Sequence, residues 1–345
     1  MNIKKKLIDK IKINGSINIS EFIQICQFEK DGYYLKNNPI GRSNDFITSP
    51  EISQMFGEIF GVFLINYWEE NIKTNFNLVE LGPGKGTLLK DVLRTSYINQ
   101  KFLNSMHLTI IEKNKSLIEI QKKNLKFKNI SWNKDFNISN KKIPTIIFSN
   151  EFFDCFPVRQ FHKKEKWYEK YVDYSEVEKN FTFVSKQVEN NTILKSLEKF
   201  EHVKVAEIAH SRDTYFELIC NFIKQHKGVF VTIDYGYKNP PNHFSLQTIF
   251  HHKKTHLFEN IGNQDITAHV NFEEFIFIAK KYNLKIDTFC SQKDFLISNG
   301  IKERMENLKK NKNKETIKNL NSAYHRLVNK SQMGEIFKVL IVSCF

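Results

Sequence analysis

Residues 78–87 read Leu78-Val79-Glu80-Leu81-Gly82-Pro83-Gly84-Lys85-Gly86-Thr87, and this stretch decides the fold that we expect. Apolar residues end in glycines at every second position, and an amphipathic run through Leu88, Leu89, Val92 and Leu93 comes next. This order predicts a strand, a tight turn and a helix. Glycine allows positive φ angles and lets a ligand lie directly against the main chain. In an open parallel sheet, nucleotide-like ligands bind in the crevice beyond such a strand.

The spacing of the glycines excludes two common nucleotide-binding loops. A dinucleotide fingerprint requires G-x-G-x-x-G, and a P-loop requires a lysine directly after its last glycine. Here Lys85 precedes the last glycine, and the acidic Glu80 stands two positions before the first. The pattern E-x-G-x-G-x-G resembles the cofactor loop of class I S-adenosylmethionine (SAM) methyltransferases, in which the acid faces the positively charged end of SAM. A glycine-rich turn without a ligand is the alternative.

The composition is that of a basic globular chain. It has 345 residues, 41% hydrophobic content and 31 phenylalanines, enough for one large α/β domain with additions or two modest domains. The formal charge of +14 favours nucleic acid, an anionic membrane or an acidic protein as partner. The lysines are scattered, however, with short clusters at residues 4–6 and 309–314. We therefore favour a basic solvated surface and expect no stable nucleic-acid complex.

The cysteines and the apolar runs bear on the compartment. The five cysteines are far apart and form no C-x-x-C pair, which is typical of reduced thiols in a reducing compartment. No apolar run reaches the roughly 20 residues that span a bilayer, so we expect no membrane span. Asp9, Lys10 and Lys12 interrupt the segment after the basic start, which is therefore not a secretory signal. These features predict a cytosolic protein.

Short apolar runs alternate with helical patterns along the chain. The expected strands lie at residues 77–81, 108–111, 129–132, 145–149, 228–233 and 337–342. This alternation predicts an α/β fold, a parallel sheet with helices on both faces. We expect residues 1–70 to form a helical segment, with Ser20 capping one helix, and residues 71–345 to form the main domain. Insertions are expected near 160–205, where polar and apolar residues alternate as in an antiparallel ribbon, and near 238–330.

Two further acids stand where this type of fold binds a cofactor. Glu112 ends the second expected strand, where a carboxylate accepts hydrogen bonds from the ribose hydroxyls. An ordinary acidic helix start, which the helix dipole favours, is the alternative. Asp135 follows Trp132 and is placed to accept a bond from the adenine amino group. A solvated loop acid is the competing explanation for Asp135.

The stretch Asn150-Glu151-Phe152-Phe153-Asp154 follows the fourth expected strand, at the catalytic edge of an open sheet. Glu151 and Asp154 are three residues apart and share one face of a helical turn. Carboxylates so placed grip a guanidinium bidentately and keep an attacking nitrogen aimed at a methyl group. Methyl transfer needs mainly alignment, so positioning supplies much of the rate. The alternative is that both acids cap and solvate the next helix.

Three other chemistries are disfavoured: methylation of nucleic-acid amino groups, catalysis by a cysteine nucleophile, and metal binding. Nucleic-acid amino-methyltransferases carry (D/N)-P-P-(Y/F) after this strand, whereas Asn150 is followed by Glu and Phe. Cys155 could be a catalytic nucleophile, but no motif with a general base accompanies it, so we expect a small buried side chain. The histidines do not have the spacing of a metal site, and we expect no metal; they are His243, His251, His252 and His256.

Seven stretches, in order from about residue 14 to the C-terminus, point to one family. Besides residues 80–88 and 150–154, they are Gly32-Tyr33-Tyr34, Asp45-Phe46-Ile47-Thr48-Ser49-Pro50-Glu51-Ile52, Ile233-Asp234-Tyr235-Gly236, Asp265-Ile266-Thr267-Ala268-His269-Val270 and Met333-Gly334-Glu335-Ile336-Phe337-Lys338-Val339-Leu340. Together they resemble the MidA family of SAM-dependent methyltransferases, which includes the mitochondrial complex I assembly factor that methylates a protein arginine.

The resemblance implies a Rossmann-like class I methyltransferase core, SAM as cofactor and a protein arginine as methyl acceptor, with a respiratory complex I subunit as candidate partner. The N-terminal segment would fold over the cofactor cleft. The implied cofactor-binding residues are Asp45, Thr48, Ser49, Glu80, Gly82, Pro83, Gly84, Gly86, Thr87, Glu112 and Asp135. The implied catalytic residues are Asn150, Glu151 and Asp154, and the substrate-binding residues are Phe152, Phe153, Asp234, Asp265, Thr267 and His269.

The chain departs from the family pattern in places that concern the acceptor more than the cofactor. Lys85 replaces a common arginine, Phe244-Ser245 replaces a usual glycine, and Gln264 replaces a commonly acidic residue. We expect a protein arginine N-methyltransferase; the alternatives are a non-catalytic SAM-fold assembly chaperone and a nucleic-acid methyltransferase. The family match begins close to Met1, which leaves no room for a long presequence, so we expect a bacterial cytoplasmic protein.

Overall fold

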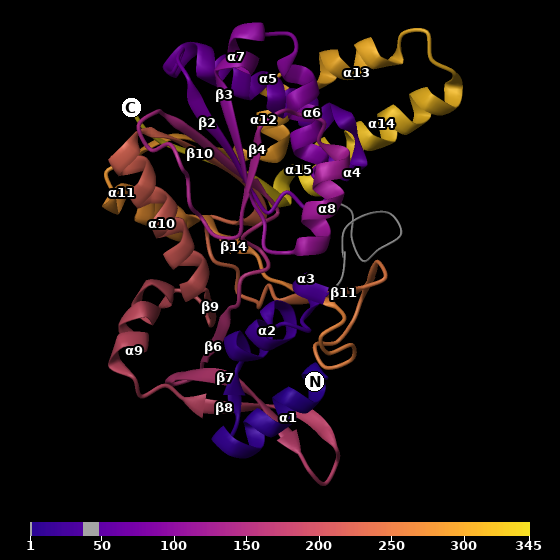
Figure 1. Ribbon diagram of the computed structural model, residues 1–345. Helices are drawn as coiled ribbons and strands as arrows, with labels where there is room; N and C mark the ends of the chain where they lie inside the picture. The colour runs from indigo at the N-terminus through magenta and orange to yellow at the C-terminus, as the bar shows by residue number, and fades with distance from the viewer. Residues whose placement is uncertain (1, 37–47) are drawn as a thin grey trace.

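The computed structural model describes residues 2–36 and 48–345, which fold around a mixed eight-stranded sheet (Figure 1). The strand order is β15 (Lys285–Ser291), β16 (Phe337–Cys344), β10 (Gly228–Tyr237), β5 (Thr145–Asn150), β2 (Phe76–Leu81), β3 (Met106–Ile111) and β4 (Ile130–Asn133), and β14 (Val270–Asn271) pairs with the end of β10. The strands from β10 to β4 are parallel, and β16 runs antiparallel between β10 and β15. The expected α/β sheet is thus present, with two strands, β14 and β15, that the sequence pattern did not predict.

The sheet is buried between two helical layers because its central strands are apolar on both faces. Leu78 and Phe148 pack into one core, and their neighbours Val79 and Ile147 pack into the other, as the alternation of side chains along a strand requires. The first layer contains α5 (Gln54–Asn71), α6 (Thr87–Ser96), α7 (Gln100–Ser105), α12 (Gln292–Ser298), α13 (Ile301–Lys309), α14 (Lys314–Val328) and α15 (Met333–Ile336). The second contains α10 (His210–His226) and α11 (Phe272–Lys281).

A second lobe lies beyond the carboxyl ends of the parallel strands (Figure 1). It combines α1 (Ile3–Asn14), β1 (Ile17–Asn18), α2 (Ile19–Phe28) and α3 (Tyr33–Lys36) with β6 (Arg159–Lys163), β7 (Trp167–Ser175), β8 (Asn180–Gln187), β9 (Val205–Ile208), α9 (Asn191–Leu197) and the short helix at Glu198–Phe200. Strand β1 pairs with β7, so the N-terminus and the expected antiparallel ribbon share one sheet. A small sheet of β11 (Gln247–Phe250), β12 (Lys253–Lys254) and β13 (Asp265–Thr267) adjoins it.

The packing divides the expected N-terminal segment 1–70 between the two lobes. Helices α1 to α3 pack with the ribbon, whereas α4 (Ser49–Ile52) leads into α5, which covers the main sheet. The predicted cap was wrong in one detail. The Asn18 side chain, rather than Ser20, caps α2 by accepting a hydrogen bond from the Glu21 amide at 2.9 Å, because the helix already begins at Ile19. Within residues 2–36 and 48–345, no helix has the length and apolar character that a membrane crossing requires.

Candidate active site

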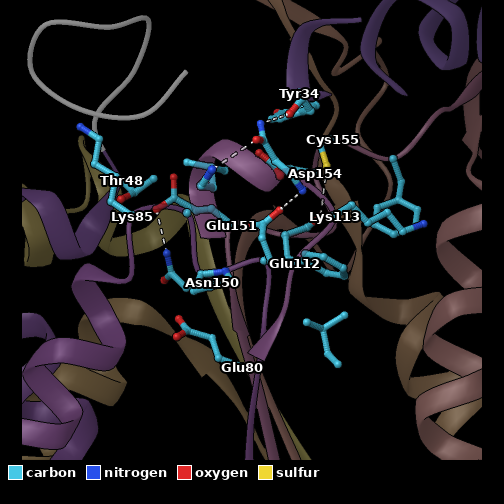
Figure 2. Close-up of a pocket in the computed structure, with 18 of the residues that line it drawn as sticks. Tyr34, Thr48, Glu80, Lys85, Glu112, Lys113, Asn150, Glu151, Asp154 and Cys155 are labelled. Atoms are coloured by element: carbon cyan, nitrogen blue, oxygen red, sulfur yellow. Dashed lines mark hydrogen bonds between the residues drawn. The ribbon is translucent and has the colours of Figure 1, made fainter. Parts of the chain in front are cut away.

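A pocket of about 390 Å³ opens between the two lobes, at the carboxyl ends of β2, β3 and β5 (Figure 2). Helices α2 and α3 of the second lobe contribute Phe28 and Tyr34 to its wall. The volume lies within the roughly 300–1,000 Å³ that is usual for pockets of small organic ligands. Of the residues expected at the site, the lining contains Thr48, Glu80, Gly82, Pro83, Gly84, Thr87, Glu112, Asn150, Glu151, Phe152 and Asp154.

The glycine loop presents bare main chain to this pocket. Gly82, Gly84 and Gly86 have φ angles of 58°, 56° and 79°, a region that side-chain-bearing residues avoid. A Cβ atom on Gly82 would lie 2.7 Å from Phe152 Cδ2, so this glycine also allows the loop to approach the aromatic ring. Gln121 holds the loop in place because its Nε2 donates to the Gly84 carbonyl at 2.7 Å. The turn is therefore a preformed surface against which a flat ligand fits.

Two buried oxygen atoms in the pocket wall lack hydrogen-bond partners among the described residues. They are Glu80 Oε2 and Asn150 Oδ1. Glu80 is 2% exposed, and burial together with the nearby charge of Glu112 raises its pKa well above the usual value. A buried carboxylate without a partner is costly, and a cationic ligand group relieves that cost. These two atoms therefore fit the positively charged end of SAM.

Glu112 occupies the end of β3, as expected, and its carboxylate lines the pocket (Figure 2). Its Oε1 accepts a hydrogen bond from the Asn114 amide at 2.8 Å, and its Oε2 accepts one from Gln121 Nε2 at 3.2 Å. Burial nevertheless raises the pKa of Glu112. Asn114 also caps α8 (Lys115–Asn124) through the Ser116 amide, which fixes the acid at the start of that helix.

Glu151 follows β5 directly and has a φ of 50°, an unfavourable conformation for a residue with a side chain. Its Oε1 accepts a hydrogen bond from the Ser49 amide at 2.9 Å. The same atom accepts one from Asn150 Nδ2 at 3.0 Å (Figure 2). Burial, with a smaller contribution from the charge of Asp154, raises the pKa of Glu151 to about 8. Burial likewise raises the pKa of Asp154 to about 6. Two carboxylates thus lie in one pocket wall, held at a desolvation cost that a cation offsets.

The remaining expected substrate-binding residues lie behind this wall. Asp234 is fully buried, and its Oδ2 accepts hydrogen bonds from the amides of Phe152 and Phe153 at 3.1 and 2.9 Å. It therefore supports the loop and does not reach the pocket. Phe153 is also fully buried, in the core of the second helical layer.

Residues from Asp265 to His269 also lie behind the pocket wall and contact residues that form or support it. Asp265 Oδ1 accepts the Tyr34 hydroxyl at 2.6 Å, so it contacts a pocket residue without lining the pocket itself. Thr267 is buried beside Tyr235, and the His269 ring packs edge-on against the same tyrosine at 5.4 Å. Burial lowers the pKa of His269.

Three expected cofactor residues, Asp135, Ser49 and Gly86, are not among the residues that line the pocket; a Cβ atom on Gly86 would lie 3.3 Å from the Leu125 side chain, so this glycine packs against Leu125. Asp135 is 83% exposed and ion-paired with Lys113 at 3.6 Å, and it is not part of the pocket wall. Ser49 contributes its amide, which bonds Glu151. Asp45 lies outside the described residues. Thr87 does line the pocket, and its hydroxyl donates to Glu51.

Four further residues belong to the site although sequence reasoning gave them no role: Tyr34, Glu51, Asn114 and Gln121. Tyr34 and Glu51 stand inside family-like stretches, which was the available signal. Gln121 carries no such signal, because its bonds to the glycine loop depend on how α8 packs. Within the described ranges, no group of three or more acidic, histidine or cysteine side chains is arranged to hold a metal ion.

The sheet order and the glycine-rich pocket together define a class I SAM-dependent methyltransferase. The chain belongs to a family of S-adenosyl-L-methionine-dependent methyltransferases, whose family model matches residues 59–290. It is therefore a methyltransferase that uses SAM as methyl donor, as the sequence predicted.

Two named relatives and one solved structure illustrate the similarity. The chain is 31% identical to the protein arginine methyltransferase NDUFAF7 homolog, mitochondrial, of Caenorhabditis elegans, over 89% of this chain and 78% of the relative. It is 29% identical to the mitochondrial protein arginine methyltransferase NDUFAF7 of Homo sapiens, over 96% and 81%. A Burkholderia thailandensis crystal structure bound to S-adenosyl-homocysteine has a TM-score of 0.85 at 21% identity, covering 99% of this chain and 92% of that one. This last likeness confirms the fold.

Proposed function

We propose that this enzyme transfers the methyl group of SAM to a guanidinium nitrogen of an arginine in a partner protein. The observation that carries the proposal is the pair of carboxylates, Glu151 and Asp154, in the wall of the SAM-type pocket. Burial raises the pKa of both carboxyl groups, so a cationic acceptor beside them would offset the cost of their ionisation. The named relatives are protein arginine methyltransferases, which supports the same acceptor class.

In this proposal SAM lies against the glycine loop, with Glu112 on its ribose and with Glu80 and Asn150 facing its charged end. SAM supplies an electrophilic methyl group carried on a positively charged sulfur. The chain supplies a dry pocket and fixed polar atoms, which stabilise charge without reorganising during the reaction. The unpartnered Glu80 Oε2 is the atom most in need of such a cation.

Glu151 is the first of two carboxylates that hold the acceptor guanidinium in this proposal. The Ser49 amide and Asn150 Nδ2 occupy Oε1, and within the described residues Oε2 accepts no hydrogen bond, so Oε2 is available to a guanidinium N–H. Asp154 supplies a second acceptor from the same loop, and a bidentate pair fixes the nitrogen's direction. In this transfer the nitrogen would bond to the methyl carbon as the bond from that carbon to the SAM sulfur breaks, and S-adenosyl-homocysteine would leave. The nitrogen's proton would go to Glu151, whose pKa of about 8 suits it as acceptor.

The proposal also covers which protein carries the methylated arginine and in which compartment the enzyme works. The MidA resemblance supports a subunit of respiratory complex I as the methyl acceptor. The expected cytoplasmic location stays a prediction, and the names of the relatives, which are mitochondrial, lend it no support.

The test is transfer of tritiated methyl from SAM into a cell extract, followed by acid hydrolysis and amino-acid analysis. We expect label in N-methylarginine with the wild-type protein and with the exposed-site control Glu273→Gln, and its loss with Glu151→Gln. Label in lysine or in nucleic acid would contradict the arginine acceptor. Binding of a partner protein without any transfer would favour the assembly-chaperone alternative.

A further inference from the structure

Among the described residues, five aromatic side chains line the pocket, Phe28, Tyr34, Phe152, Phe156 and Tyr215, and the chemistry described above gives Tyr34 no role. Tyr34 belongs to α3 of the second lobe, and Figure 2 shows it close to Asp154 and Cys155. It lines the pocket while remaining only half-buried, so part of its ring is open to a ligand. The charge of Asp154 contributes to the raised pKa of the Tyr34 phenol, after burial and the charge of Asp265.

The Tyr34 ring is fixed by contacts from three other parts of the chain. Its hydroxyl donates to Asp265 Oδ1 at 2.6 Å, and its ring stacks on Phe28 at 5.6 Å with planes 22° apart. Its main-chain carbonyl accepts a hydrogen bond from Asn114 Nδ2 at 2.6 Å. Burial and the charge of Asp265 raise the pKa of the phenol well above 10, so the hydroxyl keeps its proton and the contact persists. A ligand that stacks here therefore immobilises no further side chain.

An aromatic face beside two carboxylates selects for a particular shape of cation. Guanidinium is planar and delocalised, stacks on aromatic rings and donates hydrogen bonds from its edge, whereas an ammonium group is a compact point charge. Glu151, Asp154 and Tyr34 all line this pocket, so two carboxyl groups and an aromatic ring border the same cavity, with Asp154 also hydrogen-bonded to Tyr235 and one face of Tyr34 stacked on Phe28. Carboxylates alone would accept either cation, so the ring is the element that distinguishes them.

We propose that Tyr34 is a specificity-determining residue, the aromatic wall on which the acceptor guanidinium stacks while Glu151 and Asp154 hold its N–H groups. Asp265 is then a positioning residue that acts through Tyr34. This inference rests on the proposed function, since it presumes a guanidinium acceptor. It assigns part of the acceptor site to the N-terminal lobe, outside the methyltransferase sheet.

The test uses N-acetyl-arginine amide as probe, with neutral N-acetyl-citrulline amide and N-acetyl-lysine amide for comparison. Each is titrated into the full chain loaded with S-adenosyl-homocysteine, and binding is followed by NMR. We expect Tyr34→Leu to weaken arginine-amide binding about 2- to 30-fold, the range of a desolvated cation–π contact, with unchanged affinity for S-adenosyl-homocysteine. Tyr34→Phe keeps the ring and should bind the probe nearly as the wild type does. Tyr97→Leu, at a tyrosine that is 61% exposed, is the matched control.

The outcomes separate this inference from the proposed function. If the wild type prefers arginine amide to both comparison amides and Tyr34→Leu binds it equally well, the role of Tyr34 is refuted and the arginine acceptor stands. If the wild type shows no preference for arginine amide, the proposed function fails and this inference fails with it. If Tyr34→Leu loses S-adenosyl-homocysteine and Tyr34→Phe loses the probe, the hydroxyl rather than the ring matters, which also refutes the stacking role.

Discussion

Replacing Glu151 with glutamine should stabilise the empty protein while abolishing methyl transfer. The carboxyl group has a pKa of about 8 in the folded chain and an ordinary value of 4.5, with burial as the main cause. The folded state therefore binds more protons than the unfolded state between these two values. Stability due to this group is fully present below about pH 4.5 and is lost as the pH rises toward 8.

The magnitude follows from the same two values. Each tenfold change in the ionisation constant corresponds to about 1.4 kcal/mol, so at pH 7 the full cost is about 3 kcal/mol. Water on the open side of the pocket screens part of it, which leaves about 2–3 kcal/mol. Glutamine keeps an oxygen for the Ser49 amide and Asn150 Nδ2 but carries no charge. Removing the charge should therefore raise the melting temperature of the empty protein by roughly 3–4 °C at pH 7.

Thermal unfolding of the wild type and Glu151→Gln, each at pH 5 and pH 7 without cofactor, measures this effect. The difference between the two proteins should shrink to less than about 1 kcal/mol at pH 5, because this pH lies close to the ordinary pKa of 4.5 and little of the linked free energy remains there. An exposed-site control, Glu273→Gln, should melt like the wild type at both values. Equal or lower stability of Glu151→Gln at pH 7 would refute the claim that Glu151 is held at a desolvation cost.

Two further substitutions test the cofactor loop. In Gly82→Ala the residue would keep a φ of 58°, which costs about 1–2 kcal/mol, and its Cβ would lie 2.7 Å from the Phe152 ring and displace it. We therefore expect this variant to bind S-adenosyl-homocysteine at least about tenfold more weakly, as measured by calorimetry. Gly300→Ala has a φ of 88° but no close neighbour, and it should leave this affinity unchanged; equal affinities for both variants would contradict the loop assignment. Gln121→Ala removes hydrogen bonds to the glycine loop and to Glu112. We expect this variant to bind S-adenosyl-homocysteine about 3- to 30-fold more weakly in the same titration. An unchanged affinity would show that the loop needs no such support.

The parts of the fold that were predictable depend on local pattern. Strands β2, β3, β4 and β5 begin and end within two residues of their expected positions, and β10 begins where expected but runs on to Tyr237, because a continuous apolar run is a short-range signal. Strand β15 was missed because most of its residues are only half-buried, and its apolar pattern is correspondingly weak. Strand β16 was expected, but its antiparallel direction depends on pairing with β10 and β15 and is not encoded in its own residues.

In the site, too, the features that depend on local sequence were predictable, and those that depend on contacts between distant residues were not. The glycine loop and Glu112 were predictable because each directly follows the end of one strand, β2 and β3 respectively. The hydroxyl contact between Tyr34 and Asp265 joins residues 231 positions apart, and the amide that holds Glu151 comes from Ser49, 102 positions away. Asp234 illustrates a different difficulty. Its position after a strand suggested the pocket, yet its carboxylate faces the loop amides of Phe152 and Phe153 and is used there.

Calorimetric titration with S-adenosyl-homocysteine, of the wild type beside Gly84→Val, tests the central claim that this pocket is the cofactor site. Gly84 lines the pocket with a φ of 56°, so a branched side chain would both strain the loop and enter the ligand's path. We predict saturable binding at one site per chain for the wild type and none for the variant. Equal binding by both proteins would contradict the account, because the cofactor would then lie elsewhere.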